Sequence, residues 1–200
     1  MSKLTLFFIT RTILLLLWML FIFIIDAQTL EASEWYRPDY ISVRTFYGES
    51  KWTKIGPDPA DDYQWTNVSL YAGKNVWSWF DILTGLGIGY LKSDDFGSTQ
   101  SVEWRLLGNV KIGYFFFEFG GGLAYLFDRD NLPELANSSL YVIVSGGLGL
   151  EFHIYESEYQ KFSFKTGYRV EHISSPFHSD KDDDIGWNIG AIEATFTWRF

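Results

Sequence analysis

The chain has 200 residues, no cysteine and a formal net charge of −9, and 20% of its residues are aromatic. This length allows one domain, and the aromatic share together with 18 Gly and 5 Pro favours β-strands over packed helices. The lack of cysteine excludes disulfides and thiolate metal sites, and the acidic charge disfavours nucleic-acid binding, which needs a basic surface.

The N-terminal segment has the order of a secretory signal, with basic residues, a short apolar run at 13–25 and a small residue, Ala27. The apolar run is short for a membrane-spanning helix, which needs about 20 residues. We expect a signal peptide at 1–27, cleaved near Ala27, and a mature domain at 28–200 with a formal charge of −10. A retained anchor helix is the alternative.

The rest of the chain gives eight segments of alternating or strongly aromatic character. They lie near 40–49, 63–74, 77–92, 99–109, 112–127, 139–155, 158–174 and 187–200. Long polar connections follow the first, third, fifth and seventh segments, and the short connections are "GKNV", "NVK" and "YESEYQ". Alternating long and short connections are typical of outer-membrane barrels, whose periplasmic turns are short. The sequence predicts an eight-stranded antiparallel up-and-down transmembrane β-barrel of a bacterial outer membrane, with both termini in the periplasm.

Each predicted strand has an apolar and a polar face. In the last segment, Phe196 and Trp198 share one face, and Glu193 and Thr195 share the other. A barrel in a bilayer turns its apolar face to lipid, so the polar faces predict a paired charge network inside. Its expected members are Asp81, Glu103, Arg105, Glu118, Glu151, Lys165, Arg169, Glu171 and Glu193, with His153 beside them. Such a filled interior disfavours transport of large solutes.

The seventh segment carries the residues that point to chemistry. His172 and Ser174 share the apolar, lipid-facing side, at the extracellular end of the strand. A polar pair on that side is costly at membrane depth, so it should lie at the rim or have a task. Residues two apart are separated by roughly 6.6 Å along a strand, and side chains leaning together could let a histidine base reach a serine nucleophile.

A third residue should orient the imidazole ring. In a symmetric hairpin, Ser174 lies opposite Asn188, and His172 is diagonal to Asn188 on the same face. Asn188 is therefore the first candidate for this role. Asp184 is the second, because its negative charge would stabilise an imidazolium.

These features resemble the outer-membrane lipid A deacylase family, of the 3-O-deacylase or acyloxyacyl hydrolase type. The resemblance covers the eight-strand pattern, the signal sequence, "HIS" (172–174) and the following "DIGWN" (184–188). It implies an esterase that removes an ester-linked 3-hydroxyacyl chain from lipid A on the barrel exterior, without a cofactor. It also implies His172 as base, Ser174 as nucleophile and lipopolysaccharide of the outer leaflet as partner.

The match has gaps, because Ser175 and Pro176 follow the serine, and proline offers no backbone donor for an oxyanion hole. The alternative function is a non-enzymatic barrel with a structural, adhesion or surface-protection role.

The acidic run at 180–184 is expected to be a solvated loop rather than a divalent-cation site, and His178 in the same loop is expected to be exposed. The sequence leaves open whether the barrel forms a homodimer. Glycines are expected to relieve crowding at 120–122, 146, 147 and 149.

Overall fold

The computed structural model describes residues 37–53, 62–93, 97–127, 139–174 and 186–200. The chain divides into one unit at Met1–Arg37 and a second at Pro38–Phe200, which contains every described strand. The signal peptide expected at 1–27 lies outside the described residues. No helix among these residues is long and apolar enough to cross a membrane.

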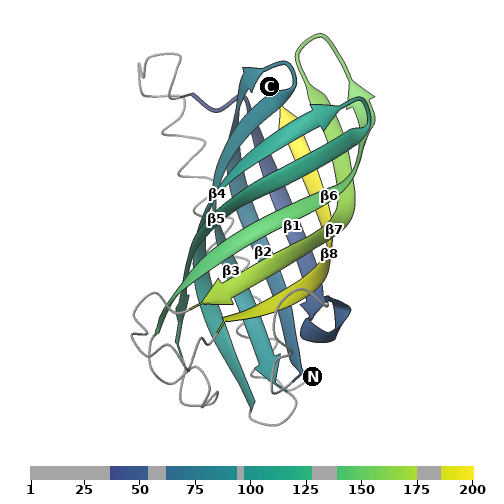
Figure 1. Cartoon of the computed structure of the whole chain (residues 1–200). Helices are drawn as coiled ribbons and strands as arrows, with labels where there is room; N and C mark the ends of the chain where they lie inside the picture. Colours follow the sequence, from purple (N-terminus) through teal and green to yellow (C-terminus); the bar gives the residue numbers. More distant parts are fainter. Residues whose placement is uncertain (1–36, 54–61, 94–96, 128–138, 175–185) are drawn as a thin grey trace, which may run out of the picture. The chain divides into compact units, whose positions relative to one another are not determined.

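Eight antiparallel strands close into a barrel in chain order, with β1 paired to both β2 and β8 (Figure 1). The strands are β1 (Tyr40–Glu49), β2 (Tyr63–Trp77), β3 (Phe80–Ser93), β4 (Gly97–Ile112), β5 (Phe115–Leu126), β6 (Leu140–Glu156), β7 (Lys161–Ser174) and β8 (Gly186–Arg199). A short 3-10 helix, η1 (Ser50–Trp52), follows β1. The predicted eight-stranded up-and-down barrel is confirmed.

The connections differ from the predicted ones in three places. The segments "GKNV" and "NVK" belong to strands, and the turns lie at 78–79 and 113–114, where Gly113 has a φ of +62°. At the first of these segments, Lys74 pairs with Asp39 at 3.0 Å, so its polarity reflects the barrel rim rather than a turn. The connection after β3, expected to be long, spans only 94–96 between the two strands. The third short turn lies at 157–160, inside "YESEYQ".

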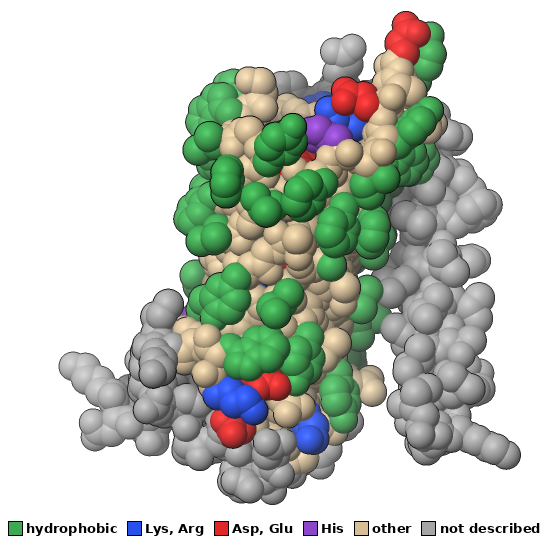
Figure 2. All heavy atoms as spheres, turned by 90° about the vertical axis from the view of Figure 1, so that its right-hand side faces the viewer, with side chains coloured by type: hydrophobic (Ala, Val, Ile, Leu, Met, Phe, Trp, Pro, Cys, Tyr) green, Lys and Arg blue, Asp and Glu red, His purple; other side chains and the backbone are tan. Residues whose placement is uncertain are grey.

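The described outer wall is apolar. Phe117, Leu148 and Phe196 are 51%, 61% and 60% exposed, and the residues on either side of Phe117 and Phe196 are buried. On the face shown in Figure 2, charged side chains gather near the two ends, and hydrophobic side chains cover the wall between them. A closed antiparallel barrel with an even strand number and an apolar exterior is the form that spans bacterial outer membranes. The protein is therefore an outer-membrane barrel. Its periplasmic end is the one with the turns at 78–79, 113–114 and 157–160, because three of the four connections at the other end are longer.

Paired charges fill the middle of the described interior. Arg44 donates two hydrogen bonds to Glu118, each of 2.6 Å, and Arg169 contacts Glu118, Glu171 and Glu193. The described network joins six basic side chains (Arg44, Arg105, Lys111, Lys165, Arg169 and Arg199) to six acidic ones (Asp81, Glu103, Glu118, Glu151, Glu171 and Glu193). Equal numbers of opposite charges allow every buried ion to have a partner, which burial requires. The predicted network is confirmed.

The expectation for His153 is wrong, because its side chain is exposed near the periplasmic end of β6. Its strand partner Ser163 is buried, and a register shift follows His153 in the pairing of β6 with β7. The end of this hairpin carries further exposed side chains, such as Ile154 and Tyr155. His153 therefore lies beyond the plugged interior.

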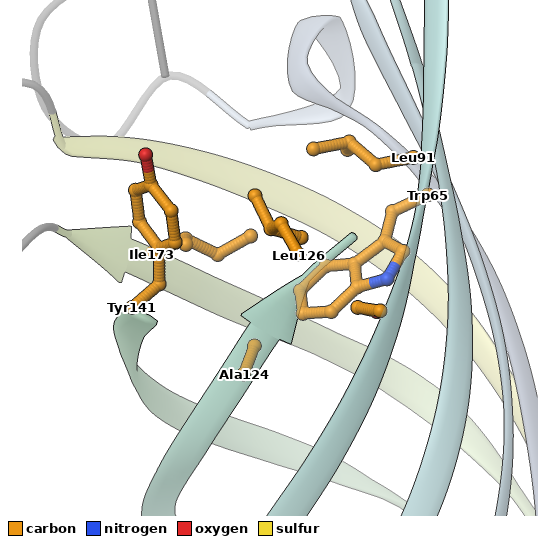
Figure 3. Close-up of a pocket in the computed structure, with 7 residues that line it drawn as sticks. Trp65, Leu91, Ala124, Leu126, Tyr141 and Ile173 are labelled. Atoms are coloured by element: carbon orange, nitrogen blue, oxygen red, sulfur yellow. The ribbon is translucent and has the colours of Figure 1, made fainter. Parts of the chain in front are cut away.

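The extracellular part of the interior is apolar instead of charged. Trp65, Leu126 and Ile173 belong to one buried cluster, whose described side chains come from seven strands. Figure 3 shows these side chains around a pocket that Leu91, Ser101, Ala124 and Tyr141 also line. The middle residue of the His172–Ser174 segment is thus held inside the barrel.

Candidate functional site

The two candidate catalytic side chains lie on the outer wall, as predicted. His172 and Ser174 are the third-last and last residues of β7, and both are half-buried on the outward side. Ile173, between them, is 4% exposed and packs in the interior cluster. Because side chains alternate along a strand, the packing of Ile173 holds the two polar residues outward.

A hydrogen bond joins His172 to a residue of the next strand. Its Nδ1 lies 3.0 Å from the Oδ1 atom of Asn188, which stands directly opposite on β8. An amide oxygen has no hydrogen, so Nδ1 carries the proton and donates it. A neutral ring that donates from Nδ1 has its free lone pair on Nε2, the atom that takes the serine proton in serine-histidine catalysis.

The register of this hairpin corrects one expectation. Ser174 lies opposite Gly186, not opposite Asn188, and Asn188 faces His172 directly rather than diagonally. The predicted register is two residues out because it assumed a symmetric turn, whereas register depends on the loop and on packing of both faces. In the observed register, Asn188 lies closer to the His172 ring than in the predicted one.

No hydrogen bond joins Ser174 to His172 within the described part of the chain. The two residues are separated by roughly 6.6 Å along the strand, as any such pair is. Catalytic hydrogen bonds are often long without substrate and shorten in the complex. The structure thus joins His172 to Asn188, and Ser174 would have to rotate to reach the ring.

Several sequence-derived candidates lie outside the described residues. They are Asp184, His178, Ser175, Pro176 and the acidic run at 180–184. Their predicted roles stay predictions. Among the described residues, no group of three or more histidines, aspartates or glutamates could hold a metal ion.

One contact near the site had no signal in the sequence. The hydroxyl of Tyr168, on the outward side of β7, donates a hydrogen bond of 2.8 Å to the backbone oxygen of Trp52 in η1. The two residues are 116 positions apart. Only the fold brings η1 onto the exterior beside β7 and β8.

Comparisons with known proteins give fold neighbours at low identity. No family model matches the chain, and no curated protein matches it. A crystal structure of the outer-membrane enzyme PagL is similar with a TM-score of 0.47 and 17% identity, over 77% of this chain and 97% of that one. Neisserial surface protein A (NspA) follows with a TM-score of 0.40 and 12% identity, over 80% and 94% of the two chains. A Pseudomonas aeruginosa FadL homologue has a TM-score of 0.28 and 12% identity, over 80% of this chain and 46% of that one.

With identities of 17% or less and TM-scores below 0.5, none of these three similarities supports a conclusion about activity. The assignment of this chain to the outer membrane rests on its own strand order and apolar exterior.

Proposed function

We propose that this barrel is an outer-membrane esterase that removes an ester-linked 3-hydroxyacyl chain from lipid A. One observation carries the proposal, namely the hydrogen bond from His172 to Asn188 on the lipid-facing wall. It sets the tautomer that a general base needs, two residues from a serine on the same face. A polar arrangement of this kind is costly against lipid and is expected to serve a function.

The position of the pair supports a lipid as substrate. His172 and Ser174 lie at the extracellular end of β7, at the level of the outer-leaflet head groups. The described interior is plugged by ion pairs, so a substrate reaches these side chains from the membrane rather than through the barrel. Ester-linked lipid A is the outer-leaflet lipid that the sequence resemblance indicates.

The chemistry divides between the three side chains. The hydroxyl oxygen of Ser174 attacks the ester carbonyl, and Nε2 of His172 accepts the hydroxyl proton. His172 returns the proton to the departing sugar oxygen, which leaves an acyl-serine. A water molecule, deprotonated by the same nitrogen, then hydrolyses the acyl-serine and restores the enzyme. Asn188 holds the ring throughout, with Asp184 as the alternative orienting residue, and no cofactor takes part.

Mass spectrometry of lipid A tests this proposal. Lipid A from cells that express the wild type should lose one 3-hydroxyacyl group. Lipid A from cells that express Ser174→Ala or His172→Ala should keep it. Identical spectra from all strains, with the barrel folded in the outer membrane, would refute the proposal.

A second candidate is a non-enzymatic barrel with a structural, adhesion or protective role. The observation that favours it is the lack of a hydrogen bond between Ser174 and His172 in the described structure. On this reading, His172 and Asn188 form a polar contact at the membrane rim. The same spectra distinguish the two functions.

A further inference from the structure

Two glycines flank Val170 on the lipid-facing wall, one on each neighbouring strand. Gly146 of β6 and Gly190 of β8 both stand opposite Val170. Among the described residues, the atom nearest to a Cβ atom added at Gly146 is the backbone oxygen of Glu118, 4.0 Å away, which is an ordinary van der Waals contact. A Cβ atom added at Gly190 would clash with the hydroxyl of Tyr168 and would lie 3.0 Å from the backbone carbon and oxygen of Trp52. Within the described part of the chain, the wall is therefore bare at Gly146 and covered at Gly190.

The cover over β8 is η1, which several contacts fix in place. The hydroxyl of Tyr168 donates to the backbone oxygen of Trp52 at 2.8 Å, and the rings of Trp52 and Tyr47 meet edge-on at 5.4 Å. At the start of η1, the hydroxyl of the buried Ser50 accepts a hydrogen bond of 3.0 Å from the backbone of Tyr63. We call η1 with its Tyr168 contact the clasp. It is tied both to the rim and to the outer wall.

This asymmetry begins directly below the catalytic pair. Val170 precedes His172 by two residues on β7, so both glycines lie one step closer to the membrane centre. On the β6 side the exposed side chains of Val144, opposite His172, and Leu148, opposite Tyr168, stand above and below Gly146. These three residues form an apolar track along β6 that spans roughly 13 Å.

We propose that the acyl chain of the lipid substrate lies along this β6 track, across Gly146, and that the clasp keeps it off the β8 side. The inference rests on the proposed esterase function. An acyl chain whose carbonyl is at Ser174 must continue towards the bilayer centre, where its methylene groups are most stable. On β8 that course meets the clasp at Gly190, whereas on β6 it passes over Gly146, which has no side chain.

Enlarging the wall on either side tests the proposal. Gly146→Val places two methyl groups on the β6 track. Ile192→Phe adds bulk on the β8 side, at a residue that is 58% exposed and stands opposite Tyr168. Wild type and both variants are purified folded in detergent micelles. Turnover is measured with lipid A in mixed micelles and with p-nitrophenyl acetate, whose acyl group is too short to reach the track.

The expected result is a fall of at least tenfold in the ratio of lipid A turnover to p-nitrophenyl acetate turnover for Gly146→Val. Ile192→Phe should keep the wild-type ratio. An unchanged ratio in Gly146→Val, or an equal fall in both variants, would overturn the inference. Should Gly146→Val fail to fold, Leu148→Trp fills the same track from an exposed position. A wild type that hydrolyses neither ester refutes the proposed function instead, so the two failures are distinguishable.

Discussion

Replacing Asn188 tests the proposed role of His172 as a base. The Oδ1 atom of Asn188 accepts the Nδ1 proton of His172 at 3.0 Å, and Asn188 is only 9% exposed although it is on the lipid-facing wall. Asn188→Leu removes the acceptor and leaves the ring free to rotate and to change tautomer. Asn188→Asp keeps an acceptor in the same place and adds a negative charge.

The size of each effect follows from the contact. A hydrogen bond to a charged group contributes about 1.5–3 kcal/mol, against about 0.5–1.5 kcal/mol between neutral groups. The carboxylate of Asn188→Asp therefore stabilises the imidazolium of the transition state by about 1 kcal/mol more than the amide does, which is about fivefold in kcat. In Asn188→Leu the ring is no longer oriented, so general acid–base catalysis is lost. The lower end of its usual contribution is about a hundredfold, and kcat should fall by that factor.

The assay is release of 3-hydroxy fatty acid from lipid A in mixed micelles, by the purified folded barrels. We expect kcat to be higher in Asn188→Asp than in the wild type, and far lower in Asn188→Leu than in the wild type. KM should change little, because Asn188 acts through His172 rather than through the lipid. Wild-type kcat in Asn188→Leu would refute the reasoning, since the ring would then need no partner on β8.

Two further predictions concern the barrel itself. Arg169→Met leaves Glu118, Glu171 and Glu193 short of a partner, and it should lower the free energy of unfolding by about 3–5 kcal/mol. Urea titration in micelles measures this loss, and failure of an added Glu193→Gln to recover part of it would contradict the network. Gly190→Ala pushes against the Tyr168 hydroxyl and the Trp52 backbone and should cost about 1 kcal/mol, or a fall of about 2–4 °C in Tm, whereas Gly146→Ala should cause no such fall. Equal Tm values for the two variants would contradict the clasp.

The face that each strand residue takes could be predicted from the sequence. Side chains alternate with a period of two, and lipid outside and charge inside make the two faces chemically different. This rule correctly placed His172 and Ser174 outward and Glu171 and Arg169 inward. It extends to Arg44 of β1, whose neighbours Val43 and Thr45 face outward.

Strand ends and register could not be predicted as well. The polar residues of "GKNV" and "NVK" indicate turns locally, but in the barrel they lie in β2 and β4, at the periplasmic ends of these strands. Antiparallel pairing tolerates a shift of two residues without exchanging the faces, so alternation does not choose between such registers. For that reason alternation alone could not place Asn188 opposite His172 rather than opposite Ser174.

Contacts between segments that are far apart in the sequence have no local sequence pattern that predicts them. The Tyr168 hydroxyl and the Trp52 oxygen meet because the closed sheet brings β1 beside β8, and no periodicity encodes that contact. The same holds for the choice of partners in the interior, where Arg44 selects Glu118, 74 residues away. Spacing predicts which residues share a side, and three-dimensional closure decides which of them touch.

Covalent labelling of Ser174 tests the central claim most directly. A fluorophosphonate reacts with a serine only when a nearby base activates it. The folded barrel in micelles should form an adduct on Ser174, located by mass spectrometry of its peptides, and His172→Ala should abolish the adduct. An unlabelled Ser174 in the wild type, or equal labelling in His172→Ala, would contradict an activated serine on the lipid-facing wall.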